Sequence, residues 1–205
     1  MAAGLRRAPD PARAHGAWVY LFVSVLAGTL AARGQGSIAA LCAGLAFVGV
    51  FVASSAIAVR PRPWRLRFAS GALFAAACAA SGLALGAEPM FLVYSMVALF
   101  PSAAAVWFAA QQGFLSPPAL VFGVLGLTVA APAAACAGGT SPQLGFLLLG
   151  LLAPFFAWRT WKTRAALGGG AGFDKARLRR LGLREAALAA AWMLACVGVV
   201  HLVAR

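Results

Sequence analysis

The chain has 205 residues, of which 63% are hydrophobic and only 10% are charged. A soluble domain carries about 25% charged residues, so this composition cannot supply the polar surface of a water-soluble globule. On a soluble protein the formal net charge of +13 would suggest a nucleic-acid partner, but basic segments of membrane proteins face the cytoplasm and anionic headgroups. We therefore expect a multi-pass membrane protein whose partners are membrane lipids and which binds no nucleic acid.

Seven apolar runs follow one another along the chain, and one crossing of a bilayer needs about 20 residues. This pattern predicts an all-α bundle of about seven transmembrane helices that forms a single domain, 1–205. The sixth run is short and is interrupted by Pro154, so its existence as a full crossing is left open. The seven runs cover residues 16–32, 37–59, 68–86, 90–109, 119–138, 143–158 and 185–204.

The first run opens with "RAHGAWVYLFVSVLAG", in which His15 stands at the edge of the apolar segment. A histidine at this place more often marks the membrane surface than carries chemistry, although His15 could pair with Glu185 at the same surface. The run also ends in "LAA", which resembles the cleavage site of a secretory signal. Its length favours an anchor that is not cleaved.

Basic residues gather in the segments that alternate crossings place on one side. Of the 17 lysines and arginines, only Arg33 and Arg205 fall in the segments expected on the other side. The positive-inside rule then places the N-terminus in the cytoplasm and the C-terminus outside, in a bacterial cytoplasmic membrane. The arginines expected to contact lipid headgroups are Arg60, Arg62, Arg65, Arg67, Arg179, Arg180 and Arg184.

The last basic segment, 159–184, is expected to be a cytoplasmic loop. Its "LGGGAGFDKARLRRLGLRE" contains three consecutive glycines followed by Asp174 and a basic stretch. Asp174 could cap a short helix that lies in the membrane interface, or the segment could be a flexible basic loop, and the sequence fits both equally.

The inner segment 110–118 carries no lysine or arginine. Gln111 and Gln112 in "QQGFLSPP" could bind a polar ligand, whereas Pro117 and Pro118 more simply end one helix and start the next.

The predicted spans are rich in Ala, Gly and Ser, which allow helix backbones to approach closely. Pro101, Pro132 and Pro154 lie within spans, and each removes one backbone donor. A neighbouring span must then cover the freed carbonyl. Broken helices can build transport sites, but a proline more often only shapes the bundle.

Residues that could carry chemistry are scarce. The four acidic residues, Asp10, Glu88, Asp174 and Glu185, form no pair with the spacing of a metal or diphosphate site. The four cysteines stand singly in apolar runs, which predicts no disulfide. The sequence accordingly predicts no metal site and no cofactor.

Three stretches carry a resemblance to a family: "HGAWVYLFVSVLAG", "RPRPWRLRFASGALFAAACA" and "LRRLGLREAALAAAW". In this order they resemble the YwiC-like family of bacterial membrane proteins. The resemblance implies a multi-pass bacterial membrane protein and supplies no catalytic residue. The positions that it singles out are His15, Gly16, Ala17, Trp18 and Glu185.

The chain also resembles, more faintly, the UbiA-type prenyltransferases, which are helical bundles with active loops on the cytoplasmic side. Those enzymes need two aspartate-rich motifs, and segments 60–67 and 110–118 contain no Asp or Glu. Prenyl transfer is therefore not expected.

We expect a non-enzymatic membrane component, such as a small carrier or a partner subunit. The alternative is an intramembrane enzyme that acts on an anionic or isoprenoid lipid at the cytoplasmic face. The candidate functional residues are His15, Gly16, Trp18, Gln111, Gln112 and Glu185.

Overall fold

The computed structural model describes residues 15–32, 36–59, 63–113, 116–167 and 175–205, and throughout these ranges the only regular element is the helix. The predicted all-α class is confirmed for this part of the chain. The helices are α1 (His15–Ala31), α2 (Gly36–Val59), α3 (Trp64–Ala84), α4 (Met90–Gln112), α5 (Pro117–Thr128), α6 (Ala130–Ala137), α7 (Pro142–Leu167) and α8 (Lys175–Val203).

Six of the predicted crossings are helices long and apolar enough to span a membrane. They are α2, α3, α4, the α5–α6 pair, α7 and α8, and the α5–α6 pair counts as one span, Pro117–Ala137. The sixth predicted run is therefore a long helix in spite of Pro154. α1 is apolar but shorter, with 17 residues. This composition and length indicate a multi-pass membrane protein.

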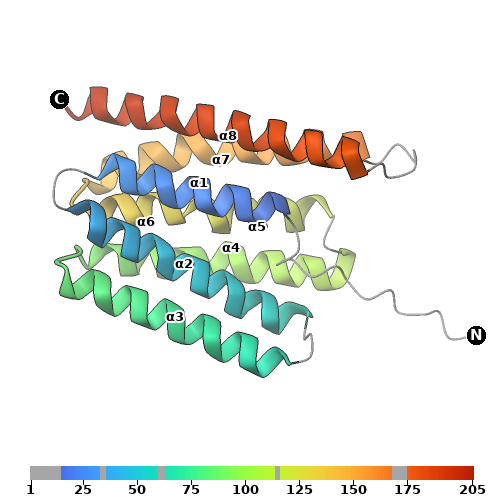
Figure 1. Cartoon of the computed structure of the whole chain (residues 1–205), viewed down its shortest axis with the longest axis horizontal. Coiled ribbons are helices and arrows are strands. Elements are labelled where there is room, and N and C mark those ends of the chain that lie inside the picture. Colours follow the sequence, from blue (N-terminus) through green and yellow to red (C-terminus); the bar gives the residue numbers. More distant parts are fainter. Residues whose placement is uncertain (1–14, 33–35, 60–62, 114–115, 168–174) are drawn as a thin grey trace, which may run out of the picture.

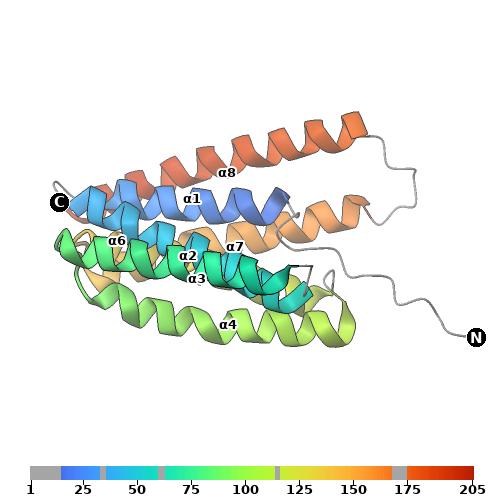
Figure 2. The ribbon, with the colours of Figure 1, turned by 60° about the horizontal axis from the view of Figure 1, so that its bottom comes forward.

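The helices lie side by side along one common direction (Figures 1 and 2). α3 and α8 form opposite edges, and α1, α5 and α6 lie between them (Figure 1). α1, α3, α5 and α8 all begin at the same end of the bundle, where α2, α4 and α7 end. We call this end the basic end, because it carries Arg65, Arg67, Lys162, Arg180 and Arg184.

The expected cytoplasmic loop 159–184 is mostly helix, which corrects the sequence interpretation. α7 continues to Leu167 and α8 already begins at Lys175, while Asp174 and its expected cap lie outside the described residues. Hydropathy ends a span where charges begin, but a helix can continue because Arg, Lys, Leu and Ala are all good helix formers. Their long side chains reach water from a helix as easily as from a loop.

Small residues bring the helix backbones of the interior into contact. A Cβ atom added at Gly28 of α1 would lie 2.2 Å from the carbonyl oxygen of Ala131 in α6. Between α2 and α3, a Cβ atom at Gly49 would lie 2.6 Å from the carbonyl oxygen of Gly71. The expected close packing through small residues is therefore present between these helices.

Two aromatic side chains donate hydrogen bonds to the backbone of α7. Trp192 Nε1 donates to the carbonyl of Leu151 at 3.0 Å. The carbonyl of the preceding residue, Gly150, receives no hydrogen bond from the helix backbone four residues on, because that residue is Pro154, which has no N–H. Tyr94 Oη donates to the carbonyl of Pro142 at 3.2 Å. The bond from Trp192 thus joins α8 to the turn of α7 that precedes Pro154.

The far end of α1 is capped by other elements. Thr140 Oγ1 donates to the carbonyl of Ala31 at 3.1 Å, and His201 Nε2 of α8 donates to the carbonyl of Leu30 at 2.9 Å. These carbonyls belong to the last turn of α1 and have no partner within their own helix. The two bonds tie α1 to α8 and to the connection between α6 and α7.

Candidate functional site at the basic end

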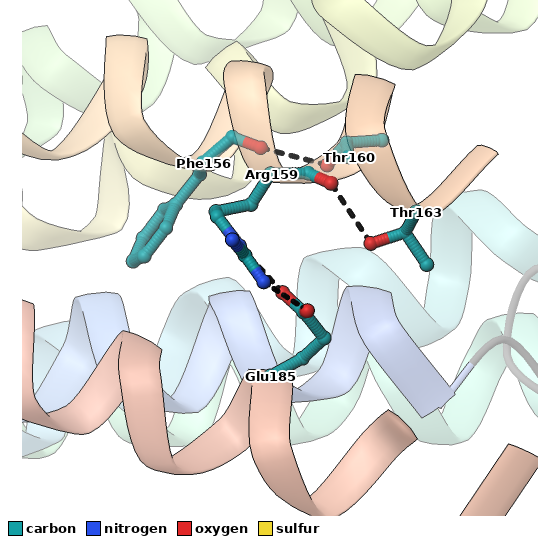
Figure 3. Close-up of polar contacts among 5 residues, drawn as sticks. All are labelled: Phe156, Arg159, Thr160, Thr163 and Glu185. Atoms are coloured by element: carbon teal, nitrogen blue, oxygen red, sulfur yellow. Dashed lines mark hydrogen bonds and ion pairs between the residues drawn. The ribbon is translucent and has the colours of Figure 1, made fainter. Parts of the chain in front are cut away.

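Arg159 of α7 and Glu185 of α8 face each other and form a two-point ion pair (Figure 3). Arg159 Nε donates to Glu185 Oε2 at 2.8 Å, and Arg159 Nη2 donates to Glu185 Oε1. The side chains are only 15% and 14% exposed. Charge-assisted bonds with two parallel contacts are strong and directional, so this pair fixes α7 against α8.

Neighbouring side chains from α1 and α7 complete this side of the site. Tyr20 of α1 stacks on Phe156 with ring centroids 4.6 Å apart, and its hydroxyl interacts with the side chain of Thr160. Thr160 and Thr163 each donate to a carbonyl one turn back in α7, those of Phe156 and Arg159, at 2.8 Å (Figure 3). Three helices therefore meet at the ion pair.

The outer side of α7 carries two cations over one indole ring. Arg159 Cζ lies 5.5 Å and Lys162 Nζ 4.3 Å from the centroid of Trp158. Both distances are within the range of cation–π attraction. Trp158 is 49% exposed and Lys162 is exposed.

Aromatic rings continue from Trp158 away from the basic end. The ring of Phe155 lies 6.2 Å from that of Trp158 and stacks on that of Trp192 at 4.9 Å. We call these three residues the aromatic row. It joins α7 to α8 on the same outer side as Lys162.

The arrangement supports anion recognition better than proton transfer. Both oxygens of Glu185 are engaged by Arg159, whereas Lys162 stands over an exposed ring. No group of three or more His, Cys, Asp or Glu that could hold a metal ion occurs in the ranges that the structure describes.

The structure does not bring Glu185 together with the described residues at the start of α1 that were predicted as site residues. Glu185 of α8 lies in the ion pair, but the side chain of His15 and the surroundings of Gly16 fall outside the described part of the structure. A contact between His15 and Glu185 therefore stays a prediction. Trp18 lies on the α2 side of α1, with its ring 5.6 Å from that of Phe22 and 5.1 Å from that of Phe51.

The other candidates that the structure describes lie at the basic end but are not brought to the ion pair. Gln111 and Gln112 are exposed in the last turn of α4, which packs on α5 and α6. Arg65 Cζ lies 5.7 Å from the ring centroid of Trp64 in the first turn of α3. Of the remaining predicted headgroup residues, Arg67 is half-buried in α3 and Arg180 and Arg184 are exposed on α8, while Arg60, Arg62 and the side chain of Arg179 lie outside the described residues.

Arg159 was missed as a site residue, because sequence reasoning used it only to end the sixth span. One signal could have found it. Arg159 closes one apolar run and Glu185 opens the next, so two antiparallel helices joined by a short connection place them at the same depth.

Comparison of the chain with protein-family models, curated proteins and solved structures finds no match. The resemblance to the YwiC-like family therefore stays a prediction.

Proposed function

We propose that the protein is a non-enzymatic membrane component that serves as a partner subunit for another membrane protein. The observation that carries this proposal is the closed centre of the bundle. A Cβ atom at Gly28 would lie 2.2 Å from the carbonyl oxygen of Ala131, and one at Gly36 would lie 2.5 Å from that of Gly138. Contacts this short leave no space for even a methyl group where α1 and α2 meet α6 and its C-cap.

The closed centre weighs against a small carrier, the other non-enzymatic function expected from the sequence. A broken helix serves transport when its irregular backbone lines a cavity that a substrate or ion can enter. Here the break between α5 and α6 falls at Val129, which is buried, and every residue of α6 is buried. The break therefore supports a rigid packing unit rather than a passage.

An enzyme that acts on an anionic or isoprenoid lipid at the cytoplasmic face is the second candidate. Glu185 is the carboxylate that the sequence offers for such chemistry, and it is bound on both oxygens by Arg159. This engagement supports a role in holding α7 to α8, and so favours the non-enzymatic proposal.

The outer faces of α3 and α4 are the surfaces that we assign to the partner. α3 packs chiefly on α2, and α4 packs chiefly on α5 and α6. Their other faces carry large apolar side chains such as Leu73, 73% exposed, and Phe100, 75% exposed. Within a bilayer, close van der Waals packing against another helix can cover such faces.

Photocrosslinking in native membranes tests the proposal. A photoreactive amino acid placed at Leu73 or at Phe100 is expected to attach to the same second polypeptide. The control position is Leu194, which is 61% exposed on α8 at the opposite edge of the bundle, and it should not attach to that polypeptide. Attachment to lipid alone at all three positions would contradict the partner-subunit function.

A further inference from the structure

We propose that the outer side of α7 and α8 at the basic end is a binding site for one anionic phospholipid. Lys162 binds its phosphate, and the aromatic row of Trp158, Phe155 and Trp192 lines its hydrocarbon chain. The site goes beyond the partner-subunit function and does not depend on it, because the lipid occupies α7 and α8 rather than α3 and α4.

The charge at this site comes from Lys162. Glu185 pairs with Arg159 through both oxygens, and among the described residues the structure places no ion pair between Glu185 and Lys162. The ammonium group of Lys162 is exposed and lies 4.3 Å from the centroid of Trp158. An anionic phosphate is complementary to this cation.

The depth of the site fits a phospholipid headgroup. Tryptophan prefers the interface between headgroups and hydrocarbon, where its ring is half in an apolar environment. Trp158 is 49% exposed, and Lys162 follows it by four residues, one turn closer to the basic end. The ammonium group of Lys162 therefore lies at the level of the phosphates.

The aromatic row adds an apolar surface beside the cation, so the site matches a ligand with a charged headgroup and a hydrocarbon chain. From Trp158 it leads through Phe155 to Trp192, away from the basic end and along the span. Trp158 and Trp192 are both exposed on this side, so a hydrocarbon chain can pack on their rings. Inorganic phosphate alone would use only Lys162.

The chain contains a matched control for this arrangement. Arg65 stands over Trp64 at 5.7 Å, in the first turn of α3 at the same basic end. In the part of the chain that the structure describes, no ring pair extends from Trp64 into the span. Arg65→Gln therefore removes the same charge from the same end without touching the aromatic row.

Native mass spectrometry of the full chain, titrated with phosphatidylglycerol or phosphatidylcholine, measures the binding. We expect one phosphatidylglycerol to bind more tightly than phosphatidylcholine. Lys162→Gln is expected to weaken phosphatidylglycerol binding about tenfold, the size of one charge-assisted contact, whereas Arg65→Gln changes it by less than about twofold. Equal losses in the two variants, or no loss in Lys162→Gln, would overturn the site.

A second pair of variants tests the hydrocarbon part. Trp158→Leu should weaken the binding of both lipids, while Trp107→Leu, which alters an exposed tryptophan of α4, should leave it unchanged. Competition by inorganic phosphate separates the two possible sources of phosphate. Failure of millimolar inorganic phosphate to displace the lipid supports the proposal, and full displacement contradicts it.

Discussion

Arg159 is partly buried between α7 and α8, so its charge depends on a single carboxylate partner. Glu185→Gln keeps the shape of the side chain but leaves this cation without a counter-ion. We expect it to lower the free energy of unfolding by about 2 kcal/mol, below the value for a fully buried pair. Denaturant unfolding in detergent micelles provides the measurement.

The double variant Arg159→Met with Glu185→Leu serves as the control for this prediction. It removes both charges and fills their place with apolar atoms, so most of the lost stability should return. A double variant less stable than Glu185→Gln would show that the pair contributes more than its own charge balance.

Trp192 offers a second test at a single residue. Trp192→Phe preserves a ring that can stack on Phe155 but removes the N–H that donates to the carbonyl of Leu151. The expected loss in unfolding free energy is about 1 kcal/mol, the net contribution of one hydrogen bond. Trp107→Phe, at an exposed position of α4, should change stability much less, and equal losses would assign the effect to ring size.

Among the helices, α3 is the element that depends most on one neighbour, because it packs chiefly on α2. A Cβ atom at Gly71 would lie 2.7 Å from the amide nitrogen of Ala53 and 2.8 Å from the carbonyl oxygen of Gly49. Gly71→Ala must therefore push the two backbones apart, and we expect a loss of about 2 kcal/mol in unfolding free energy.

Gly150→Ala is the matched substitution for this prediction. It also adds one methyl group to a helical glycine, but nothing lies within 4 Å of the added atom. Stability should stay the same or rise by up to about 1 kcal/mol, because Ala favours the helix. If both variants unfold alike in micelles, close contact between α2 and α3 does not hold α3 in place.

The existence of the helices followed from the sequence, while the ends of α7 and α8 did not. An apolar run long enough to span a membrane is a strong signal, and it located six spans within a few residues. The ends of α7 and α8 lie among arginines, lysines and alanines, where hydropathy stops but helix propensity continues. Interhelical bonds such as Trp192 to Leu151 need the rotation of each helix about its axis, which composition does not specify.

For the whole molecule, the alternating direction of the helices predicts which side of the membrane each end of the bundle occupies. Pro63 directly precedes α3 and Gly113 directly follows α4, so reporter fusions ending at these residues lie at the basic end. Fusions ending at Gly86, after α3, and at Gly139, after α6, lie at the far end. We expect the first two to report the cytoplasm and the last two the outside. Fusions at Pro63 and Gly113 that report different compartments would contradict the threading.

Only part of the candidate site at the basic end could be predicted from the sequence. The crowding of arginines at one end and the position of Glu185 were visible, because charge placement follows from the order of the spans. The choice of Arg159 as the partner of Glu185 depends on how α7 and α8 are rotated and how far each extends. The aromatic row depends on the same two quantities.

The lengths of α7 and α8 have a consequence for the membrane surface at the basic end. Their 26 and 29 described residues are about 39 Å and 44 Å long, more than the roughly 30 Å of a typical hydrocarbon layer. Both helices therefore continue past the hydrocarbon, and the turns of α8 that carry Arg180 and Arg184 project through the headgroups toward the water. This projection gives the protein a rigid helical surface outside the lipid, which a water-soluble molecule can reach without entering the bilayer.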